Sequence, residues 1–245
     1  MIHLSKNKNA VKIYDGPSEI DGKRIIVIVT GLASGSKNTK TGEMIQSYIM
    51  PYAVKPNEAI KTGADYSVCG NCPLRPLTHK ATPKSERKSE KACYVKTFHG
   101  PRSTWEANKD LPVSSPEAVA ELLGDRAFRF GTWGDPAAAP ARVFSPMRKG
   151  RNHTGYTHQS TGAGKGRTEL MASVHSEEER QDAKKKGFRT FRIISNVSEV
   201  NEGEILCPAS KEAGFKTDCN HCSLCMGDRH SKGLRAKDVA IVAHK

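Results

Sequence analysis

The stretch that most constrains this chain lies near its C-terminus, where four cysteines are crowded together. Cys207-Pro208 is followed by Cys219, Cys222 and Cys225, so the spacing is C-P-x10-C-x2-C-x2-C. Thiols at such short intervals form disulfides or bind a metal. At 245 residues the chain can bury a core of its own, so it does not need its cysteines merely to rescue a very small fold.

The rest of the sequence indicates a reducing compartment for these thiols. Residues 1–8 lack the apolar segment of a secretion signal, and no apolar run approaches the ~18 residues that a membrane helix needs. We therefore expect a cytoplasmic protein without a membrane partner. In that compartment cysteines serve as metal ligands or reactive thiols rather than as disulfides.

The tight C-x2-C-x2-C loop favours a [4Fe–4S] cluster over zinc. Cysteines at this spacing present three thiolates to one cube, and the fourth ligand commonly comes from a distant cysteine followed by proline, as at Cys207-Pro208. A tetrahedral zinc site more often uses two separate C-x2-C pairs. Cys207, Cys219, Cys222 and Cys225 are therefore predicted to hold a closed [4Fe–4S] cluster, with zinc as the alternative.

A second, looser group comprises Cys69, Cys72 and Cys93. Three thiolates on a [4Fe–4S] cluster would leave one iron open for a substrate or cofactor. Three thiolates on zinc would need a fourth ligand, for which His79 and His99 are the nearest candidates. We predict a second metal site here and leave both metals open, together with the interpretation that these thiols bind nothing.

The hydrophobic pattern predicts strands alternating with helices. Short β-branched runs indicate buried strands, whereas segments that begin with a capping serine and end with glycine indicate helices. Residues 1–22 are expected to be turn-rich, and residues 78–91 to form an exposed basic loop. We expect helices at 116–124 and 176–187, and strands at 24–30, 44–52 (or a short helix there), 126–132, 153–158, 169–174, 188–195, 204–206 and 238–243.

This order of elements predicts an α/β fold in which parallel βα units form a partial or complete barrel. We expect one domain over residues 1–245. Within it we place a cysteine and basic-loop insertion at 65–100, a βα core at 126–200 and a C-terminal cluster-binding segment at 204–230. Hydrophobic residues make up only 36% of the chain, so much of it should be loop or polar surface.

Three polar residues follow successive predicted strands of the βα core: Asp135, His158 and His175. Chemistry in parallel α/β folds gathers at the carboxyl ends of the strands. We therefore predict that these three residues line a catalytic pocket, where they could bind a substrate or exchange protons near neutral pH. Each of them alone could also be a hydrogen-bonded structural residue.

A formal net charge of +13 indicates a polyanionic partner, most commonly nucleic acid. The stretch from 142 to 168 contains no acidic residue and carries most of the candidate contacts. Such a stretch suits phosphate-backbone binding, although a solvated loop is the plainer interpretation. The predicted nucleic-acid-binding residues are Arg142, Arg148, Lys149, Arg151, Lys165 and Arg167.

Several short motifs together resemble an uncharacterised family of cysteine-rich proteins encoded by bacteriophages. The resemblance covers most of the chain from about residue 25 onward, and it implies a phage origin and the cytoplasm of the host cell. It brings no established activity with it. The motifs are Asn38–Gly42, Val68–Pro73, Ala92–Val95, Gly134–Ala138, Thr154–Gln159 and Cys207–Ser210.

The cysteine pattern is also similar, more loosely, to radical-SAM enzymes. These have a parallel βα barrel, a three-cysteine [4Fe–4S] cluster with an open iron and often a C-terminal auxiliary cluster. The resemblance implies that Cys69, Cys72 and Cys93 hold the first cluster and the C-terminal four cysteines the second, with S-adenosylmethionine as a cofactor. The chain lacks the usual C-x3-C-x2-C spacing and a glycine-rich motif for that cofactor.

Taken together, the sequence predicts an iron–sulfur α/β protein of phage type, with a radical-SAM-like barrel, that acts on or with nucleic acid. One alternative is a non-enzymatic, zinc-stapled nucleic-acid-binding protein. Another is a phage protein that binds and inhibits an acidic host protein.

Overall fold

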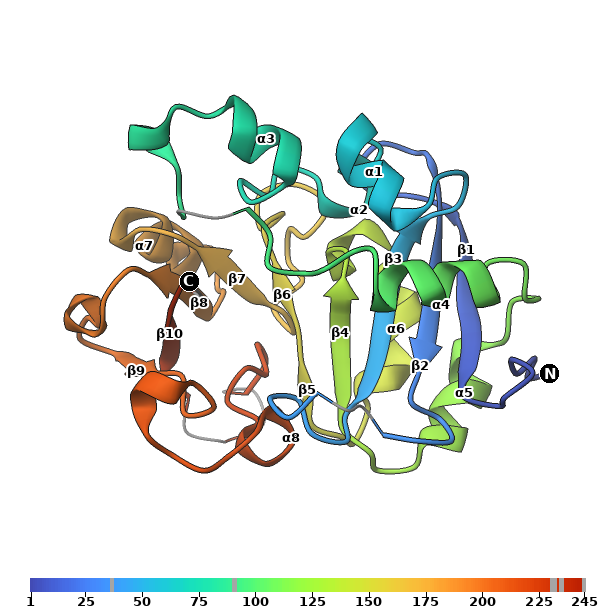
Figure 1. The fold of residues 1–245 in the computed structure, drawn as a ribbon. Helices are drawn as coiled ribbons and strands as arrows, with labels where there is room; N and C mark the ends of the chain where they lie inside the picture. The colour runs from blue at the N-terminus through green and yellow to red at the C-terminus, as the bar shows by residue number, and fades with distance from the viewer. Residues whose placement is uncertain (36–37, 90–91, 230–232, 234–235, 244–245) are drawn as a thin grey trace.

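The fold is described from a computed structural model of the full chain, in which two five-stranded sheets lie side by side (Figure 1). The structure describes all residues except 36–37, 90–91, 230–232, 234–235 and 244–245. The fold is thus a mixed α/β architecture with two mostly parallel sheets and βα units.

The first sheet has the order β1-β2-β3-β4-β5. The pairs β1–β2 and β2–β3 are antiparallel, whereas β3–β4 and β4–β5 are parallel. The β-branched run of β2 is almost completely buried, as expected for a central strand. The strands are β1 (Ala10–Pro17), β2 (Arg24–Thr30), β3 (Ile45–Pro51), β4 (Phe128–Trp133) and β5 (His153–Thr154).

The second sheet has the order β6-β7-β8-β10-β9, and every pair in it is parallel. Parallel strands place all their carboxyl ends on one edge, which continues the edge formed by β3 and β4 in the first sheet. The strands are β6 (Tyr156–Thr157), β7 (Met171–Val174), β8 (Thr190–Ile194), β9 (Glu204–Leu206) and β10 (Asp238–Val242).

A single residue, Gly155, joins the two sheets, because β5 ends at Thr154 and β6 begins at Tyr156. A Cβ atom on Gly155 would lie 2.7 Å from Leu170 Cδ2 and 2.9 Å from Phe130 Cδ2. The side chains of Leu170 and Phe130 therefore occupy the space that a Cβ atom would need at this position. The expected strand at 153–158 is confirmed in position but forms two short strands that pair with different neighbours.

The residues at the ends of the helices explain where they begin and end. In α7, Ser176 caps the first turn by accepting from the backbone N–H of Glu179, and lysines occupy the last turn, as the helix dipole favours. The helices are α1 (Pro56–Thr62), α2 (Tyr66–Cys69), α3 (Pro76–Ala81), α4 (Gly100–Asn108), α5 (Pro116–Leu123), α6 (Ala141–Arg148), α7 (Glu177–Lys185) and α8 (Cys219–Cys222). Short 3-10 turns lie at Lys84–Glu86, Pro136–Ala138, Val197–Glu199 and Lys211–Ala213.

The first sheet and its helices enclose the main hydrophobic core. Strands β1 to β4 meet α5 and α6 there, and the Phe130 ring lies 5.0 Å from that of Phe128 and 5.1 Å from that of Phe144, between centroids. Among the described residues, the second sheet has two small apolar clusters, one around Ala172 and Phe188 and one around Met171 and Val239. Most of the apolar burial therefore belongs to the first sheet.

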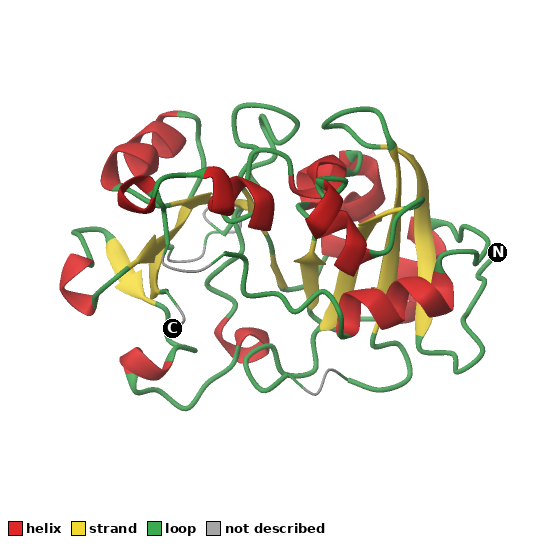
Figure 2. Cartoon of the chain, turned by 45° about the horizontal axis from the view of Figure 1, so that its top comes forward, coloured by secondary structure: helices red, strands yellow, loops and turns green. Residues whose placement is uncertain are grey.

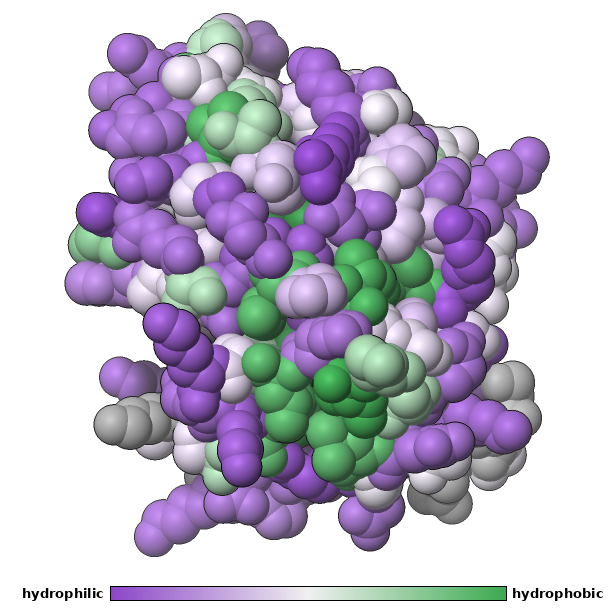
Figure 3. All heavy atoms as spheres, turned by 90° about the vertical axis from the view of Figure 1, so that its right-hand side faces the viewer, coloured by the Kyte–Doolittle hydropathy of each residue, from purple (hydrophilic) through white to green (hydrophobic). Residues whose placement is uncertain are grey.

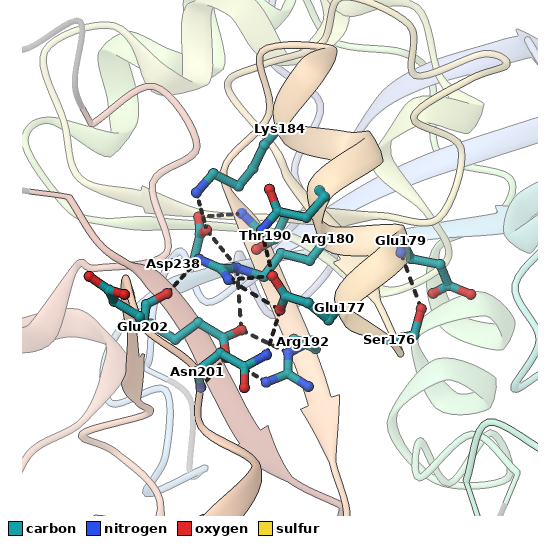
Figure 4. A network of polar contacts seen from close by, with 12 residues as sticks. Ser176, Glu177, Glu179, Arg180, Lys184, Thr190, Arg192, Asn201, Glu202 and Asp238 are labelled. Carbon is teal, nitrogen blue, oxygen red and sulfur yellow. Dashed lines mark hydrogen bonds and ion pairs between the residues drawn. The ribbon is translucent and has the colours of Figure 1, made fainter.

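The second sheet is instead held by buried ion pairs between α7, β8, β9 and β10 (Figure 4). Arg180 is 2% exposed and its Nε lies 3.0 Å from Asp238 Oδ2. The Arg192 Nε donates to Glu204 Oε1 at 2.9 Å, and Asp238 also accepts from the backbone N–H of Thr190. Each of these buried charges has a partner of opposite charge. Burying a charge without such a partner would cost much free energy.

The structure also corrects two sequence-based expectations. Residues 1–22 are not only turns, because β1 pairs with β2 and buries Val11 and Ile13. The turn signal at residues 15–17 forms the end of this strand, and the one at residues 21–22 follows it. Within the expected basic loop at 78–91, α3 and a 3-10 turn occupy the first part, and residues 90 and 91 lie outside the described residues. The strand alternative at 44–52 is confirmed over the helix.

Two further views describe the surface and the loops. Figure 2 shows long loops around the strands, in keeping with the low hydrophobic content. On the side formed by the first sheet's outer edge, apolar side chains gather within a hydrophilic surround (Figure 3). Leu4 and Val113, which flank β1 through isolated bridges, are exposed apolar residues of that half of the chain. Among the described residues, no helix combines the length and the apolar character needed to cross a membrane.

Candidate metal centres

The first cysteine group lies at the carboxyl ends of β4 and β6. The loop that follows α2 is held there by three hydrogen bonds from neighbouring strands. The backbone N–H of Asp135 donates to the Val68 carbonyl at 2.6 Å, and Gln159 Nε2 donates to the Cys69 carbonyl at 3.1 Å. The backbone N–H of Asn71 donates in return to Gln159 Oε1 at 3.4 Å. The Cys69–Cys72 loop is thus fixed to the strand ends.

Gly70 allows this close approach. Its φ of +52° lies where side chains are rarely tolerated, and a Cβ there would lie 2.5 Å from Gln159 Oε1. The Cys69-Gly70-Asn71-Cys72 sequence therefore needs glycine both for the turn and for contact with the strand ends.

Cys93 joins the same group, because its backbone N–H donates to the Leu74 carbonyl at 2.7 Å. Burial raises the pKa of Cys69 well above its usual range, and the neighbouring Cys72 and Cys93 raise it further. Burial likewise raises the pKa of Cys72 to about 12, although the backbone N–H of Leu74 donates to this thiol and lowers it. Three partly buried thiols are therefore close enough to affect one another's ionisation.

His158 and His175 meet beside these thiols. His158 Nε2 lies 3.9 Å from Cys72 Sγ and 3.2 Å from His175 Nε2. Burial lowers the pKa of His158 to about 3, with a further lowering by His175, and burial also lowers the pKa of His175. Both imidazoles are therefore neutral at physiological pH, which is the form that binds metals.

Asp135 holds this arrangement rather than facing into it. Its carboxylate accepts from the backbone N–H groups of Ala137 and His158, at 2.9 and 2.8 Å, and from the Thr157 hydroxyl at 3.0 Å. Burial raises its pKa to about 6, against the lowering by these hydrogen bonds. The side chain is 8% exposed, so its position favours orienting His158 over direct contact with a substrate.

Residues 219–227 of the C-terminal cysteine segment lie at the opposite, amino ends of the strands, whereas Cys207 directly follows β9. The backbone N–H of Cys219 donates to the carbonyl of Lys40, which precedes β3, at 2.8 Å. Arg189, which precedes β8, donates from Nη1 to the carbonyls of Leu224 and Met226 at 2.8 and 2.6 Å. The backbone N–H of Gly227 donates to Glu169, just before β7, at 3.1 Å. The segment is therefore hydrogen-bonded to residues that precede three strands, β3, β7 and β8.

The four thiols of this segment gather at one place. Cys225 is buried with Met171 and Val239, and Cys207 packs against the same cluster. Burial raises the pKa of Cys225, and Cys207, Cys219 and Cys222 raise it further. Cys207 accepts hydrogen bonds from the backbone N–H groups that follow it, those of Ala209 and Ser210, which stabilise a thiolate.

Tyr156 and Arg129 adjoin the C-terminal thiols from the strands. Tyr156 forms a hydrogen bond with Cys225, and this contact lowers the pKa of the thiol. Burial raises the pKa of Cys219 to about 11, and Arg129 opposes that rise. Arg129 Nη2 also donates to the Tyr94 hydroxyl at 3.2 Å, next in sequence to Cys93. Arg129 therefore lies between the two cysteine groups.

Both groups offer thiols to a metal, but neither is closed on a single ion. Among the described residues, no three His, Cys, Asp or Glu side chains are placed to hold one metal ion, and all seven cysteines are unbridged. A tetrahedral zinc site would bring its sulfurs to about 3.8 Å from one another. An iron–sulfur cube holds its cysteines farther apart, because iron and sulfide fill the space between them. The four C-terminal thiols affect one another's pKa, but as the described part of the chain stands they are not placed to share a single ion.

The histidines proposed from sequence as a fourth ligand are placed differently. His79 Nε2 lies 2.9 Å from the Ser89 carbonyl, and His99 is exposed beside the Phe98 ring. The imidazole that reaches the thiols is that of His158, far away in sequence. The predicted strand-end row of Asp135, His158 and His175 is brought together, with His158 between Cys72 and His175.

The predicted nucleic-acid-binding residues divide into internal and exposed ones. Arg151 is buried and donates to the carbonyls of Ala120, Gly124, Pro146 and Met147, and buried Arg167 pairs with Glu169. These two guanidinium groups are occupied inside the protein, which corrects their assignment as phosphate contacts. Arg148 pairs with Asp228 at 2.8 Å. The exposed members of the set are Arg142, Lys149 and Lys165.

Sequence reasoning missed Gln159 and Arg129 as parts of these sites. Gln159 is the residue after His158, so its position just past a strand end was the available signal. Arg129 lies inside a predicted strand between two buried phenylalanines, where a charged residue on the opposite face indicates a specific environment.

Comparison of the chain with protein-family models, with curated proteins and with solved structures gave no match. The resemblances to phage cysteine-rich proteins and to radical-SAM enzymes therefore stay predictions. The geometry of the two cysteine groups is the basis for assigning a function.

Proposed function

We propose that this is an iron–sulfur protein that works on or with nucleic acid. In this proposal Cys207, Cys219, Cys222 and Cys225 hold a [4Fe–4S] cluster, and Cys69, Cys72 and Cys93 contribute to a second metal centre. The observation that carries the proposal is the gathering of the four C-terminal thiols around Cys225, from two segments separated in sequence.

The surroundings of the four thiols support a bound anion cluster. Four thiolates around iron carry net negative charge, which burial disfavours unless it is compensated. Burial raises the pKa of Cys219 and of Cys207, but Arg129 opposes the rise at Cys219 and Lys40 opposes it at Cys207, while Tyr156 donates to Cys225. When bound, such a cluster supplies one-electron chemistry or structural cross-linking. The chain's own residues position it and exclude water through Met171 and Val239.

The two sheets would act as a partial barrel that holds the centres at opposite ends of its parallel strands. The second centre then lies at the carboxyl edge, where α/β enzymes commonly place their chemistry. A radical-SAM-like activity would require an open iron on Cys69, Cys72 and Cys93. Nucleic acid is proposed as the partner from the net charge of +13 and the exposed Arg142, Lys149 and Lys165.

The first test is anaerobic purification of the full chain, followed by iron, sulfide and zinc analysis and a visible spectrum. A [4Fe–4S] cluster gives a brown protein with a broad absorption near ~400 nm, and Cys222→Ser should remove it. Cys72→Ser serves as the matched variant, because it should leave that absorption in place if the four-cysteine centre is independent. A colourless protein that contains zinc alone would contradict the iron–sulfur assignment.

The partner is tested separately by titrating DNA and RNA against the protein at several salt concentrations. Phosphate contacts make log K fall linearly with log salt, with a slope of about −0.7 to −0.9 per contact. Replacing Lys149 with alanine should reduce this slope by about one contact, whereas Arg167→Ala, which alters an internal residue, is not expected to act through phosphate. Binding that is absent or independent of salt would contradict the proposal.

A second candidate is a zinc-stapled nucleic-acid-binding protein without catalysis. The approach of His158 Nε2 to 3.9 Å from Cys72 Sγ favours it, because mixed sulfur and nitrogen ligands are typical of zinc. The same metal analysis separates the two candidates, since this one predicts zinc at both cysteine groups and no iron.

A further inference from the structure

Three possible donor atoms follow one another at the carboxyl edge: His158 Nε2 lies 3.9 Å from Cys72 Sγ on one side and 3.2 Å from His175 Nε2 on the other. They come from the loop after α2 and from the ends of β6 and β7. We infer that these three side chains are ligands of one divalent metal ion of the zinc class. The inference rests on the proposed second metal centre and specifies its ligands, adding His158 and His175 to the cysteine group.

The distances match the edges of a tetrahedral site. Zinc bonds of about 2.0–2.1 Å to nitrogen and 2.3 Å to sulfur imply edges of about 3.3 Å between two nitrogens and 3.6 Å between nitrogen and sulfur. The two imidazole nitrogens lie 3.2 Å apart, and the nitrogen–sulfur edge is 3.9 Å. The nitrogen–nitrogen distance agrees closely with that of a zinc site, and the nitrogen–sulfur distance is slightly longer than in such a site.

The remaining distance, between Cys72 Sγ and His175 Nε2, has to shorten when an ion binds. The reason is that no three of the described His, Cys, Asp and Glu side chains are placed to share one ion. The two histidines directly follow parallel strands, and Asp135 fixes the backbone N–H of His158 at 2.8 Å. Gln159 holds the Cys69 carbonyl, so the thiol of Cys72 would close this distance by turning its side chain toward His175. Binding of the ion therefore requires a movement of the Cys72 thiol and no change in the sheet.

The chemistry of the donors selects the metal. Two imidazoles and one thiolate suit zinc and similar borderline ions, whereas iron–sulfur cubes take mostly thiolates. Cys69 and Cys93 lie beside Cys72, so one of these thiols can fill the fourth position. The two cysteine groups would then hold different metals: a cluster at the amino ends of the strands and a single ion at the carboxyl ends.

The inference is tested by measuring zinc and cobalt bound to the full chain purified without oxygen. His158→Ala and His175→Ala should each lower bound zinc from about one equivalent per chain to near zero, while the iron of the C-terminal centre stays. His99→Ala is the matched control, because its imidazole is exposed and was the sequence-based candidate. It should retain full zinc.

A second variant keeps the test valid if the alanine variants fold poorly. His158→Cys replaces one ligand type by another, so the protein should still bind Co²⁺ and show a stronger sulfur-to-cobalt charge-transfer band. An unchanged band in His158→Cys would overturn the inference. Zinc retained by both alanine variants but lost in Cys72→Ser would also overturn it, while leaving the second centre standing. Metal content unaffected by Cys69, Cys72 and Cys93 variants would remove the second centre and the inference together.

Discussion

The two sheets of this protein are stabilised in different ways. The first sheet surrounds a continuous hydrophobic core that runs from Val11 through Phe130 to Met147. The second sheet has two small apolar clusters, and its charged residues Arg180 and Arg192 are buried in ion pairs with carboxylates. Cys225 of the cysteine segment packs against it with Met171 and Val239. The first sheet also has an ion pair with little exposure, Lys12–Asp15, but we expect apolar burial to dominate its stability, whereas the second sheet depends more on charges and on what its thiols bind.

The largest expected effect comes from removing the C-terminal metal centre. Structural metal sites can supply about 10 kcal/mol or more of folding free energy in small domains, and we expect several kcal/mol here. Cys225→Ala, or chelation without oxygen, should raise amide hydrogen exchange in β7, β8 and β10. Exchange in β2 and β3 should change little. Equal loss of protection in both sheets would contradict the division between them.

Next in size is the loss of a buried ion pair. Arg180→Ala leaves Asp238 buried without its closest cation, so we expect a cost of about 3–5 kcal/mol in free energy of unfolding, measured by urea denaturation. Lys184→Ala is the matched control, because Lys184 also pairs with Asp238, at 3.7 Å, but is 45% exposed. That change should cost less than about 1 kcal/mol. Similar costs for both variants would show that burial of Arg180 does not matter.

A smaller effect is expected at the loop that carries Cys69 and Cys72. Gly70→Ala should cost about 1–3 kcal/mol and weaken metal binding at the first cysteine group, because the new methyl would strike Gln159. Gly124 has a similar positive φ of +59° with no atom near its Cβ position, so Gly124→Ala measures backbone strain alone. The difference between the two variants should shrink in a Gln159→Ala background. No difference between them would show that Gln159 does not clamp the loop.

The smallest effect concerns acid sensitivity of the second sheet. Burial tends to raise the pKa of Glu177, but hydrogen bonds from Gln181, Asn201 and Arg180 lower it from 4.5 to about 2. A folded-state pKa below the unfolded value gives stability that is present above about 4.5 and is lost as the pH falls toward 2. Glu177→Gln should flatten this part of the pH dependence of urea midpoints. An unchanged slope would assign the acid sensitivity to other carboxylates.

Local patterns predicted the strands after β1 and two helices, α5 and α7, because the causes of these elements lie within them. The same patterns missed other helices, among them α1, α4 and α6. The serine cap and the terminal lysines predict where α7 begins and ends, and the β-branched run predicts β2, without reference to the rest of the chain. Turn signals around residues 15–22 concealed β1, since a hairpin strand and its turn share neighbouring residues. The parallel βα order also indicated which strand ends would meet.

The candidate sites were predictable in residue type but not in partners. The sequence offered His79 and His99 for the first cysteine group because they are near in the chain, yet parallel strands bring His158 and His175 there instead. Arg151 looked like part of a basic surface, but the carbonyl groups at the ends of α5 and α6 draw it inward. Tertiary contacts of this kind leave no periodic signal in a sequence.

Gly155 is the point at which the two sheets of the molecule meet along the chain. It is the sole residue between a strand that belongs to one sheet and a strand that belongs to the other, and its neighbours leave no room for a side chain. The side chains of Phe130 and Leu170 fill the space that a Cβ atom would need there. A side chain at this position would therefore have to displace residues next to both sheets, so we expect a single substitution at residue 155 to disturb both halves of the molecule.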